Sequence, residues 1–204
     1  MSTVVAPLAY TGSIGLWAFM TTAQTLIIEQ HDYYQKQTLR NRTHIHGANG
    51  KLMLSIPVKH LGIIGRQYYH TVEIENSFTW QKQHWKSIQS AYRSSPYFEF
   101  YEDNLAILYK TDFSSLYTFN KACFELLLKL LGWEPTIQYT ESYENTPAAR
   151  DIRTQIEQKK STHDVALRYT QVFEDKNGFI PNLSIIDLLF NEGPNALILL
   201  NARV

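Results

Sequence analysis

The N-terminal part of the chain runs from a strand pattern through a loop and a short helix pattern into a second strand pattern. This order restricts the fold more than any other feature. Residues 3–6 and 25–29 are typical of buried strands, and residues 14–23 favour a helix with Ser13 as its N-cap. Two strands separated by one helix predict a parallel pair with a right-handed crossover. Because ligands bind beyond the carboxyl ends of parallel strands, we expect a site where loop 8–13 and Glu29 share one edge.

The segment 29–46 is unusually polar for a stretch that follows a buried strand. It contains two acids, three cations, three histidines and two tyrosines. Residues 47–50 include an Asn-Gly turn signal, and residues 51–58 are predicted to be the returning strand of a hairpin. If the outgoing strand spans residues 40–46, its period of two places four basic or imidazole side chains on one face. These are Arg40, Arg42, His44 and His46. Such a face suits a phosphate or a carboxylate.

Helical patterns dominate the rest of the chain. Helices are predicted at residues 80–93, 96–110, 115–132, 184–193 and 194–201, and strands at residues 71–75 and 135–140. The apolar stripe that includes Leu116, Cys123 and Leu127 predicts that the third of these helices lies in the core. The polar stretch 141–161 leaves two interpretations open, a short helix around Ile152 and Ile156 or a surface segment.

These elements predict an α/β fold, with a mixed sheet opened by a βαβ unit and a largely helical C-terminal half. We expect a single domain, residues 1–204, with a sheet-rich part at 1–76 and a mainly helical part at 77–204.

Charge and cysteine content limit the functional classes. The 19 basic and 19 acidic residues give a net charge of +0, so no global field attracts nucleic acid, which is not an expected partner. The single cysteine, Cys123, excludes a disulfide framework within the chain, as is usual in a reducing compartment. No window approaches the roughly 18 apolar residues of a membrane span. We therefore expect a cytoplasmic protein.

Several motifs resemble one known family. The segments that carry the resemblance in the first half are Glu29-Gln30-His31, Tyr34-Gln35-Lys36-Gln37, Arg40-Asn41-Arg42, Ala48-Asn49-Gly50 and Ser55-Ile56-Pro57-Val58. Trp80-x-x-x-His84-Trp85, Ala91-Tyr92, Pro96-Tyr97-Phe98 and residues 182–191 follow in the same order. Together they look like the WbqC-like family. Ala6-Pro7-Leu8-Ala9-Tyr10 departs from the Gln-Pro-Tyr-Phe-x-Pro segment of many members, so a role for that glutamine does not carry over. The resemblance implies a setting in O-antigen and other surface-polysaccharide synthesis, without a settled reaction.

Glu29 and His31 are the candidate catalytic residues. A carboxylate at the end of a buried strand beside a histidine suits a general base or a partner for a sugar hydroxyl. The structural alternative is an ion pair from Glu29 to Arg40 or Arg42 across the end of the sheet.

The candidate substrate-binding residues are mainly anion binders. Lys36, Arg40 and Arg42 are cations that suit phosphate, and the loop with Tyr10 and Ser13 precedes a helix whose amides suit the same anion. We expect the loop and these cations to converge on one cleft. The remaining candidates are Tyr34, Asn41, His84 and Asp187. His84 has packing as its alternative role, and Asp187 is expected to serve mainly in a Ser184-x-x-Asp187 capping box.

The residues favour an enzyme that transfers a group from a nucleotide-activated sugar or another phosphate-bearing ligand. The alternative is a non-catalytic binding or partner protein of the same pathway that uses the basic face. His44-x-His46 provides two ligands where a zinc site needs at least three, so no metal site is predicted. The residues identify no cofactor and leave the oligomeric state open.

Overall fold

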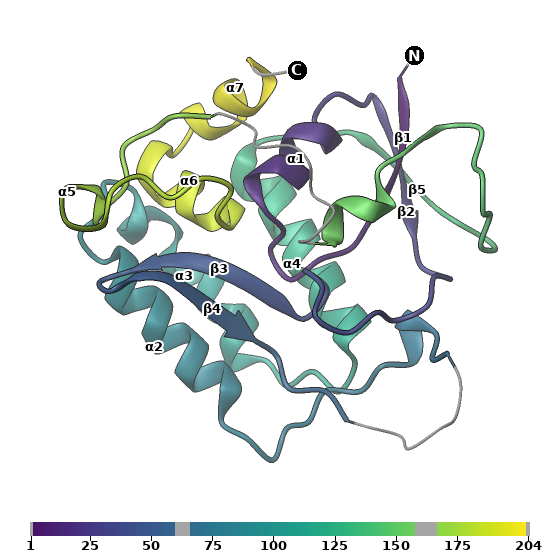
Figure 1. The fold of residues 1–204 in the computed structure, drawn as a ribbon, viewed down its shortest axis with the longest axis horizontal. Helices are drawn as coiled ribbons and strands as arrows, with labels where there is room; N and C mark the ends of the chain where they lie inside the picture. Colours follow the sequence, from purple (N-terminus) through teal and green to yellow (C-terminus); the bar gives the residue numbers. More distant parts are fainter. Residues whose placement is uncertain (1, 60–65, 158–166, 203–204) are drawn as a thin grey trace.

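The computed structural model describes residues 2–59, 66–157 and 167–202. Four parallel strands form its main sheet, in the order β5-β2-β1-β6. They are β1 (Thr3–Pro7), β2 (Thr25–Glu29), β5 (Thr136–Tyr139) and β6 (Arg150–Asp151). Helix α1 (Ile14–Met20) connects β1 to β2, whose parallel register pairs Pro7 with Glu29. The predicted βαβ opening is therefore confirmed, and both strands end at the same edge (Figure 1).

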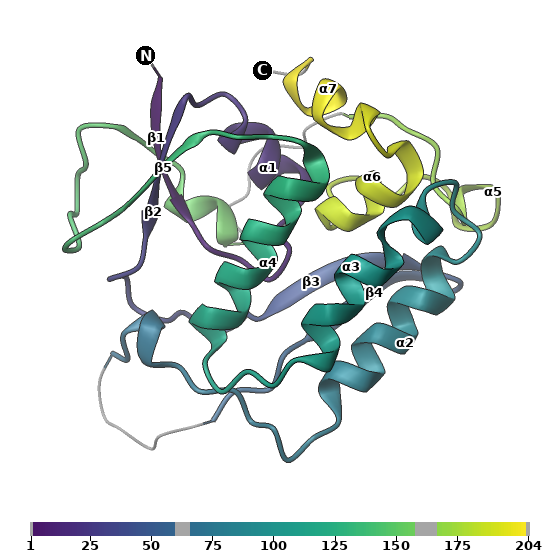
Figure 2. The same cartoon turned by 180° about the vertical axis from the view of Figure 1, so that it is seen from behind.

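The two faces of the parallel sheet have different surroundings. Val4, Ala6, Leu26 and Ile28 point into the main hydrophobic core. Their strand neighbours Val5 and Ile27 lie on the opposite face, as the period of two requires. The chain from residue 140 to residue 149 extends away from the helices beyond this sheet, as both views show (Figures 1 and 2). One face of the sheet is thus core, and the other has room for a ligand.

The hairpin is a second, separate sheet. Strands β3 (Arg42–Gly47) and β4 (Gly50–Ser55) pair antiparallel around the two-residue turn Ala48-Asn49, as the turn signal predicted. Gly50 has a φ of +101°, a conformation that other residues adopt only with strain. The α/β fold is confirmed, and the parallel and antiparallel pairings occupy different sheets.

Helices surround the hairpin and cover the inner face of the parallel sheet (Figures 1 and 2). They are α2 (Trp80–Tyr92), α3 (Phe98–Lys110), α4 (Leu116–Leu131), α5 (Glu174–Asn177), α6 (Ile185–Glu192) and α7 (Asn195–Asn201). Ser115 caps α4 by accepting a hydrogen bond from the Thr118 amide, and Gly132 ends it in the left-handed region. The stripe with Cys123 and Leu127 is buried as predicted. In the described ranges, no helix has the length and apolarity to cross a membrane.

Two segments differ from the sequence-based expectations. Residues 71–75 form no continuous strand; instead the 3-10 helix η1 (Tyr69–Thr71) is followed by single bridges at Glu73 and Ile74. The polar stretch contributes β6 and the 3-10 helix η2 (Arg153–Ile156). Ile152 and Ile156 are buried, which anchors this stretch to the sheet.

Candidate functional site at the carboxyl edge of the parallel sheet

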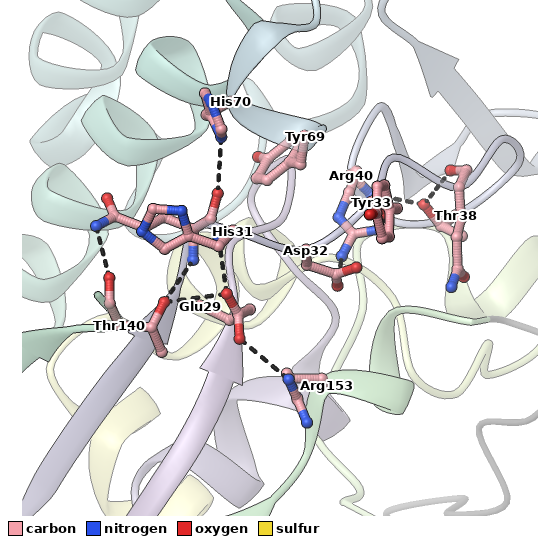
Figure 3. A network of polar contacts seen from close by, with 12 residues as sticks. Glu29, His31, Asp32, Tyr33, Thr38, Arg40, Tyr69, His70, Thr140 and Arg153 are labelled. Atoms are coloured by element: carbon pink, nitrogen blue, oxygen red, sulfur yellow. Dashed lines mark hydrogen bonds and ion pairs between the residues drawn. The ribbon is translucent and has the colours of Figure 1, made fainter. Parts of the chain in front are cut away.

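Glu29 is the last residue of β2, and its side chain is buried although it is charged. Its Oε1 accepts hydrogen bonds from the His31 amide at 2.7 Å and the Thr140 hydroxyl at 3.0 Å. Its Oε2 accepts one from Nη1 of Arg153 at 3.0 Å (Figure 3). Thr140 follows β5 and Arg153 follows β6, so three parallel strands contribute to the network at their carboxyl ends. This is the edge at which the sequence predicted a site.

Arg153 is the cation of this site. It donates from Nε and Nη2 to Asp151, at 2.9 and 2.7 Å, and from Nη2 to the carbonyl of Glu144 at 2.8 Å. The hydrogen bonds to Asp151 hold the pKa of Arg153 above its ordinary value. The alternative that Glu29 pairs with Arg40 or Arg42 is therefore wrong in its choice of partner, because Arg153 from the polar stretch takes that place.

A cavity of about 480 Å³ opens beside Glu29, on the face of the sheet away from the core. Val5 and Ile27 form part of its apolar lining. Its polar lining includes Glu29, Gln138, Thr140, Glu141, Glu144 and Arg153. A carboxylate has roughly four acceptor positions, and three donors occupy positions on Glu29, so one remains for a ligand. Hydroxyls and amides around a small apolar surface suit a sugar, whose rim is polar and whose faces carry C–H groups.

Arg40 stabilises the loop that follows Glu29. Its side chain is 1% exposed, forms an ion pair with Asp32, and donates from Nη1 to the Tyr33 carbonyl at 3.0 Å (Figure 3). The guanidinium also lies 5.0 Å from the centroid of the Tyr69 ring. Arg40 is a buried structural cation, and an incoming phosphate would have to break its ion pair.

The loop before α1 adjoins the basic segment that follows Glu29. The Tyr10 amide donates to the Leu39 carbonyl at 2.8 Å, so the two segments lie side by side, while their common cleft with Lys36, Arg40 and Arg42 stays a prediction. The amides at the start of α1 are already bonded, that of Ile14 to the Leu183 carbonyl and that of Gly15 to Oδ1 of Asn182. Ser13 caps the helix through the Leu16 amide. These helix amides are therefore engaged within the chain, and the anion role of the loop stays a prediction.

Tyr10 and His84 meet in the core. The Tyr10 hydroxyl lies 3.0 Å from Nδ1 of His84 and 2.9 Å from the hydroxyl of Tyr109. Burial lowers the pKa of His84 to about 4, so this histidine is neutral at pH 7. His84 is buried and packs in the core, as the alternative to a substrate-binding role predicted.

Asp187 is also buried, with tyrosines as its partners. Its carboxylate accepts hydrogen bonds from Tyr92 at 2.8 Å and Tyr169 at 2.7 Å, and burial raises its pKa to about 6. Ser184 alone caps α6, through the Ile186 amide. The expected capping role of Asp187 is therefore wrong.

Comparison with known proteins assigns the family. The model of the WbqC-like protein family matches residues 9–165 and 155–198. The chain belongs to the WbqC-like family. It is similar to an uncharacterised protein of Mycobacterium tuberculosis, Rv1507c, with 24% identity over 209 residues that cover 89% of this chain and 90% of the relative. No solved structure matches the chain.

The basic candidates of this WbqC-like chain do not form the open strand face that the sequence predicted. Arg40 precedes β3, and His46 is 0% exposed with Nδ1 3.1 Å from Oε1 of Gln171. Arg42 and His44 are half-buried, and Lys36 is exposed. None of the three cations lines the cavity at Glu29. The residues predicted to bind phosphate therefore lie outside the cavity that Glu29 lines.

Arg42 is the cation of the WbqC-like chain whose geometry best suits an anion. Its Nε is buried and has no hydrogen-bond partner among the described residues. Burial raises the pKa of the nearby Tyr34, and the positive charges of Arg40 and Arg42 act to lower it. Burial, Lys51 and Arg42 lower the pKa of His44 to about 4. Positive charge thus collects at the start of the hairpin. The adjacent Asn41 donates to the Ile56 carbonyl at 3.0 Å and has a structural role there.

Sequence reasoning missed Arg153 and Thr140. Arg153 lies in the most polar stretch of the chain, residues 141–161, where one charged residue among many carries no local signal. The spacing of Ile152 and Ile156 around it was the available sign that this segment packs against the sheet. Thr140 is the last residue of a predicted strand, which is a position where parallel sheets place functional groups.

Proposed function

We propose that this WbqC-like protein is a cytoplasmic enzyme of surface-polysaccharide biosynthesis that transfers a sugar from a nucleotide-activated donor to an acceptor sugar. The carrying observation is the buried Glu29 carboxylate, held by His31, Thr140 and Arg153 beside a cavity at the carboxyl edge of the sheet. The family name supports the assignment to surface-polysaccharide biosynthesis. The polar and apolar lining of the cavity supports a sugar as the ligand.

The charges of the cavity favour an uncharged acceptor there. Glu29, Glu141 and Glu144 outnumber Arg153 in its lining, and Asp151 already neutralises much of the arginine charge. Phosphate would be repelled at this position, whereas hydroxyl groups can donate to the carboxylates. The acceptor sugar therefore occupies the cavity, with its apolar face toward Val5 and Ile27.

Glu29 is placed to accept a proton in the transfer. The acceptor hydroxyl donates to the remaining acceptor position of Glu29, which takes the proton as the oxygen attacks the anomeric carbon of the donor. The new bond joins the acceptor oxygen to that carbon. The bond from the anomeric carbon to the diphosphate breaks, and the nucleoside diphosphate leaves with the electron pair. The donors from His31, Thr140 and Arg153 orient Glu29 throughout.

The test measures binding of free monosaccharides and transfer from nucleotide sugars. Glu29→Gln should abolish transfer and weaken monosaccharide binding, while Glu134→Gln, an exposed acid outside the cavity, should change neither. Because Glu29→Gln also removes an ion pair, Ala148→Trp provides a second variant that fills the cavity and leaves the network intact. Equal monosaccharide affinity in wild type and Ala148→Trp would contradict the proposal.

One observation favours a second function, a sugar-binding protein of the same pathway without catalysis. Three donors on one carboxylate suit a fixed binding group as well as they suit a base. The experiment separates the two functions. Monosaccharide binding that Ala148→Trp abolishes, without transfer from any nucleotide sugar in the wild type, would assign the binding function.

A further inference from the structure

Four planar side chains, three of them exposed, form a stack beside the Glu29 site. The rings of Tyr33 and Tyr68 are stacked with their centroids 4.8 Å apart and an interplanar angle of 19°. The ring of His70 stacks with Tyr68 at 5.6 Å, and the guanidinium of Arg66 lies 5.6 Å from the centroid of Tyr33. Tyr68 is 46% exposed, and Arg66 and His70 are exposed as well. We call these four residues the aromatic platform.

The backbone beneath the platform is held firmly. The Tyr34 amide donates to the Gln67 carbonyl, and the Tyr69 amide donates to the Asp32 carbonyl, both at 2.8 Å. The buried Arg40 adds a hydrogen bond to the Tyr33 carbonyl and an ion pair to Asp32. The half-buried Tyr33 and the exposed Tyr68 are preorganised on such a rigid backbone, so a ligand that stacks on them pays little conformational entropy.

The charge of the platform is positive. Arg66 has no ion-pair partner in the part of the chain that the structure describes, and no carboxylate is among the four residues. The guanidinium of Arg66 over the half-buried Tyr33 ring occupies the position that a planar base would take, and after displacement it can pair with the attached phosphate. An aromatic surface with a free arginine is typical of sites that bind nucleotides through stacking and charge.

We propose that the aromatic platform of Tyr33, Tyr68, His70 and Arg66 binds the nucleobase and proximal phosphate of the activated sugar donor. This inference rests on the proposed function, because it supplies the donor for the acceptor at Glu29. Tyr33 lies four positions after Glu29 in the chain, so the two Cα atoms are at most about 14 Å apart. His70 also donates from Nδ1 to the Gln30 carbonyl at 3.3 Å, next to Glu29 (Figure 3). The base and the anomeric carbon of an extended nucleotide sugar can therefore reach the platform and the Glu29 site together.

The experiment titrates the protein with uridine, cytidine, adenosine and guanosine monophosphates by calorimetry, and separately with free monosaccharides. At least one nucleotide should bind the wild type, and Tyr68→Ala should weaken it about 5- to 100-fold through lost stacking. Phe78→Ala, which removes another exposed ring at 63% exposure, is the matched control and should leave binding unchanged. Arg66→Ala should weaken the monophosphate and leave the matching nucleoside unaffected.

The outcomes separate this inference from the proposed function. Absence of nucleotide binding in the wild type, or equal affinity in wild type and Tyr68→Ala, overturns the platform. A monosaccharide that loses affinity on Tyr68→Ala, without any nucleotide effect, overturns it too, because the platform would then hold a sugar. Nucleotide binding that depends on Tyr68, without monosaccharide binding at Glu29, supports the platform and contradicts the proposed acceptor site.

Discussion

The carboxylate of Glu29 is paired with Arg153, a residue 124 positions further along the chain, at 3.0 Å. Both side chains are almost fully buried, at 1% and 7% exposure. The pair joins the end of β2 to the segment after β6 and so closes the edge strand onto the sheet. It also fixes the orientation of the acid that we place at the centre of the site.

Removal of Arg153 should destabilise the fold. Arg153→Gln leaves the buried Glu29 without its ion-pair partner, so we expect the free energy of unfolding to fall by about 3–5 kcal/mol. Urea unfolding measures this free energy, and Arg93→Gln, a change at an exposed arginine, is the control. The double variant Glu29→Gln, Arg153→Gln should recover part of the loss, because the buried carboxylate is then gone and the unpaired Asp151 is partly exposed to water. Strict additivity of the two single changes would contradict a direct pair.

The stability of the protein should depend on pH through Asp187. Its pKa is raised to about 6 in the folded state, whereas the unfolded chain releases this proton near 3.8. This group therefore favours folding most at low pH, and that contribution is lost as the pH rises from about 4 to about 6. Asp187→Asn removes the titration, so the wild type should lose about 3 kcal/mol relative to the variant over this range.

Urea unfolding at several pH values measures the difference between wild type and Asp187→Asn. The exposed Asp103→Asn serves as control and should follow the wild type. Parallel curves for the wild type and Asp187→Asn would show that Asp187 is already ionised in the fold at low pH.

The two arginines that flank Asn41 should respond differently to truncation. Arg40→Ala leaves the buried Asp32 unpaired and should lower the free energy of unfolding by about 3–5 kcal/mol. Arg42→Ala removes a half-buried side chain without an ion pair in the described ranges and should change it by no more than about 1 kcal/mol.

Arg42→Ala should nevertheless weaken anion binding, measured as the rise in melting temperature that sulfate produces in the wild type. If sulfate raises the melting temperature of Arg42→Ala as much as that of the wild type, Arg42 does not bind the anion.

The stripe of α4 should behave as core. Leu127→Ala leaves a cavity among buried side chains and should destabilise by about 2–5 kcal/mol. Ile107→Ala on α3, where the isoleucine is 61% exposed, is the control and should stay within about 0.5 kcal/mol of the wild type. Urea unfolding checks both, and similar midpoints for the two variants would contradict the assigned packing.

Local patterns were sufficient for the order of the elements and for the edge that carries the site. Apolar runs, Ser13 and Ser115 as caps, and Gly132 as a stop depend on residues close in sequence. The parallel pairing of β1 with β2 followed from the helix between them, and it placed Glu29 at the carboxyl edge.

Tertiary structure decided which polar groups became partners. Glu29 lies near several cations in sequence, yet its partner is Arg153, because β6 joins the sheet beside β1 and brings that arginine to the same edge. Arg40 is drawn into the core by Asp32, and Asp187 by Tyr92 and Tyr169. A period of two or 3.6 tells which residues share a face, but not which segment covers that face. Burial then selects the partner, since a charge removed from water must find its hydrogen bonds among whatever groups the packing brings close.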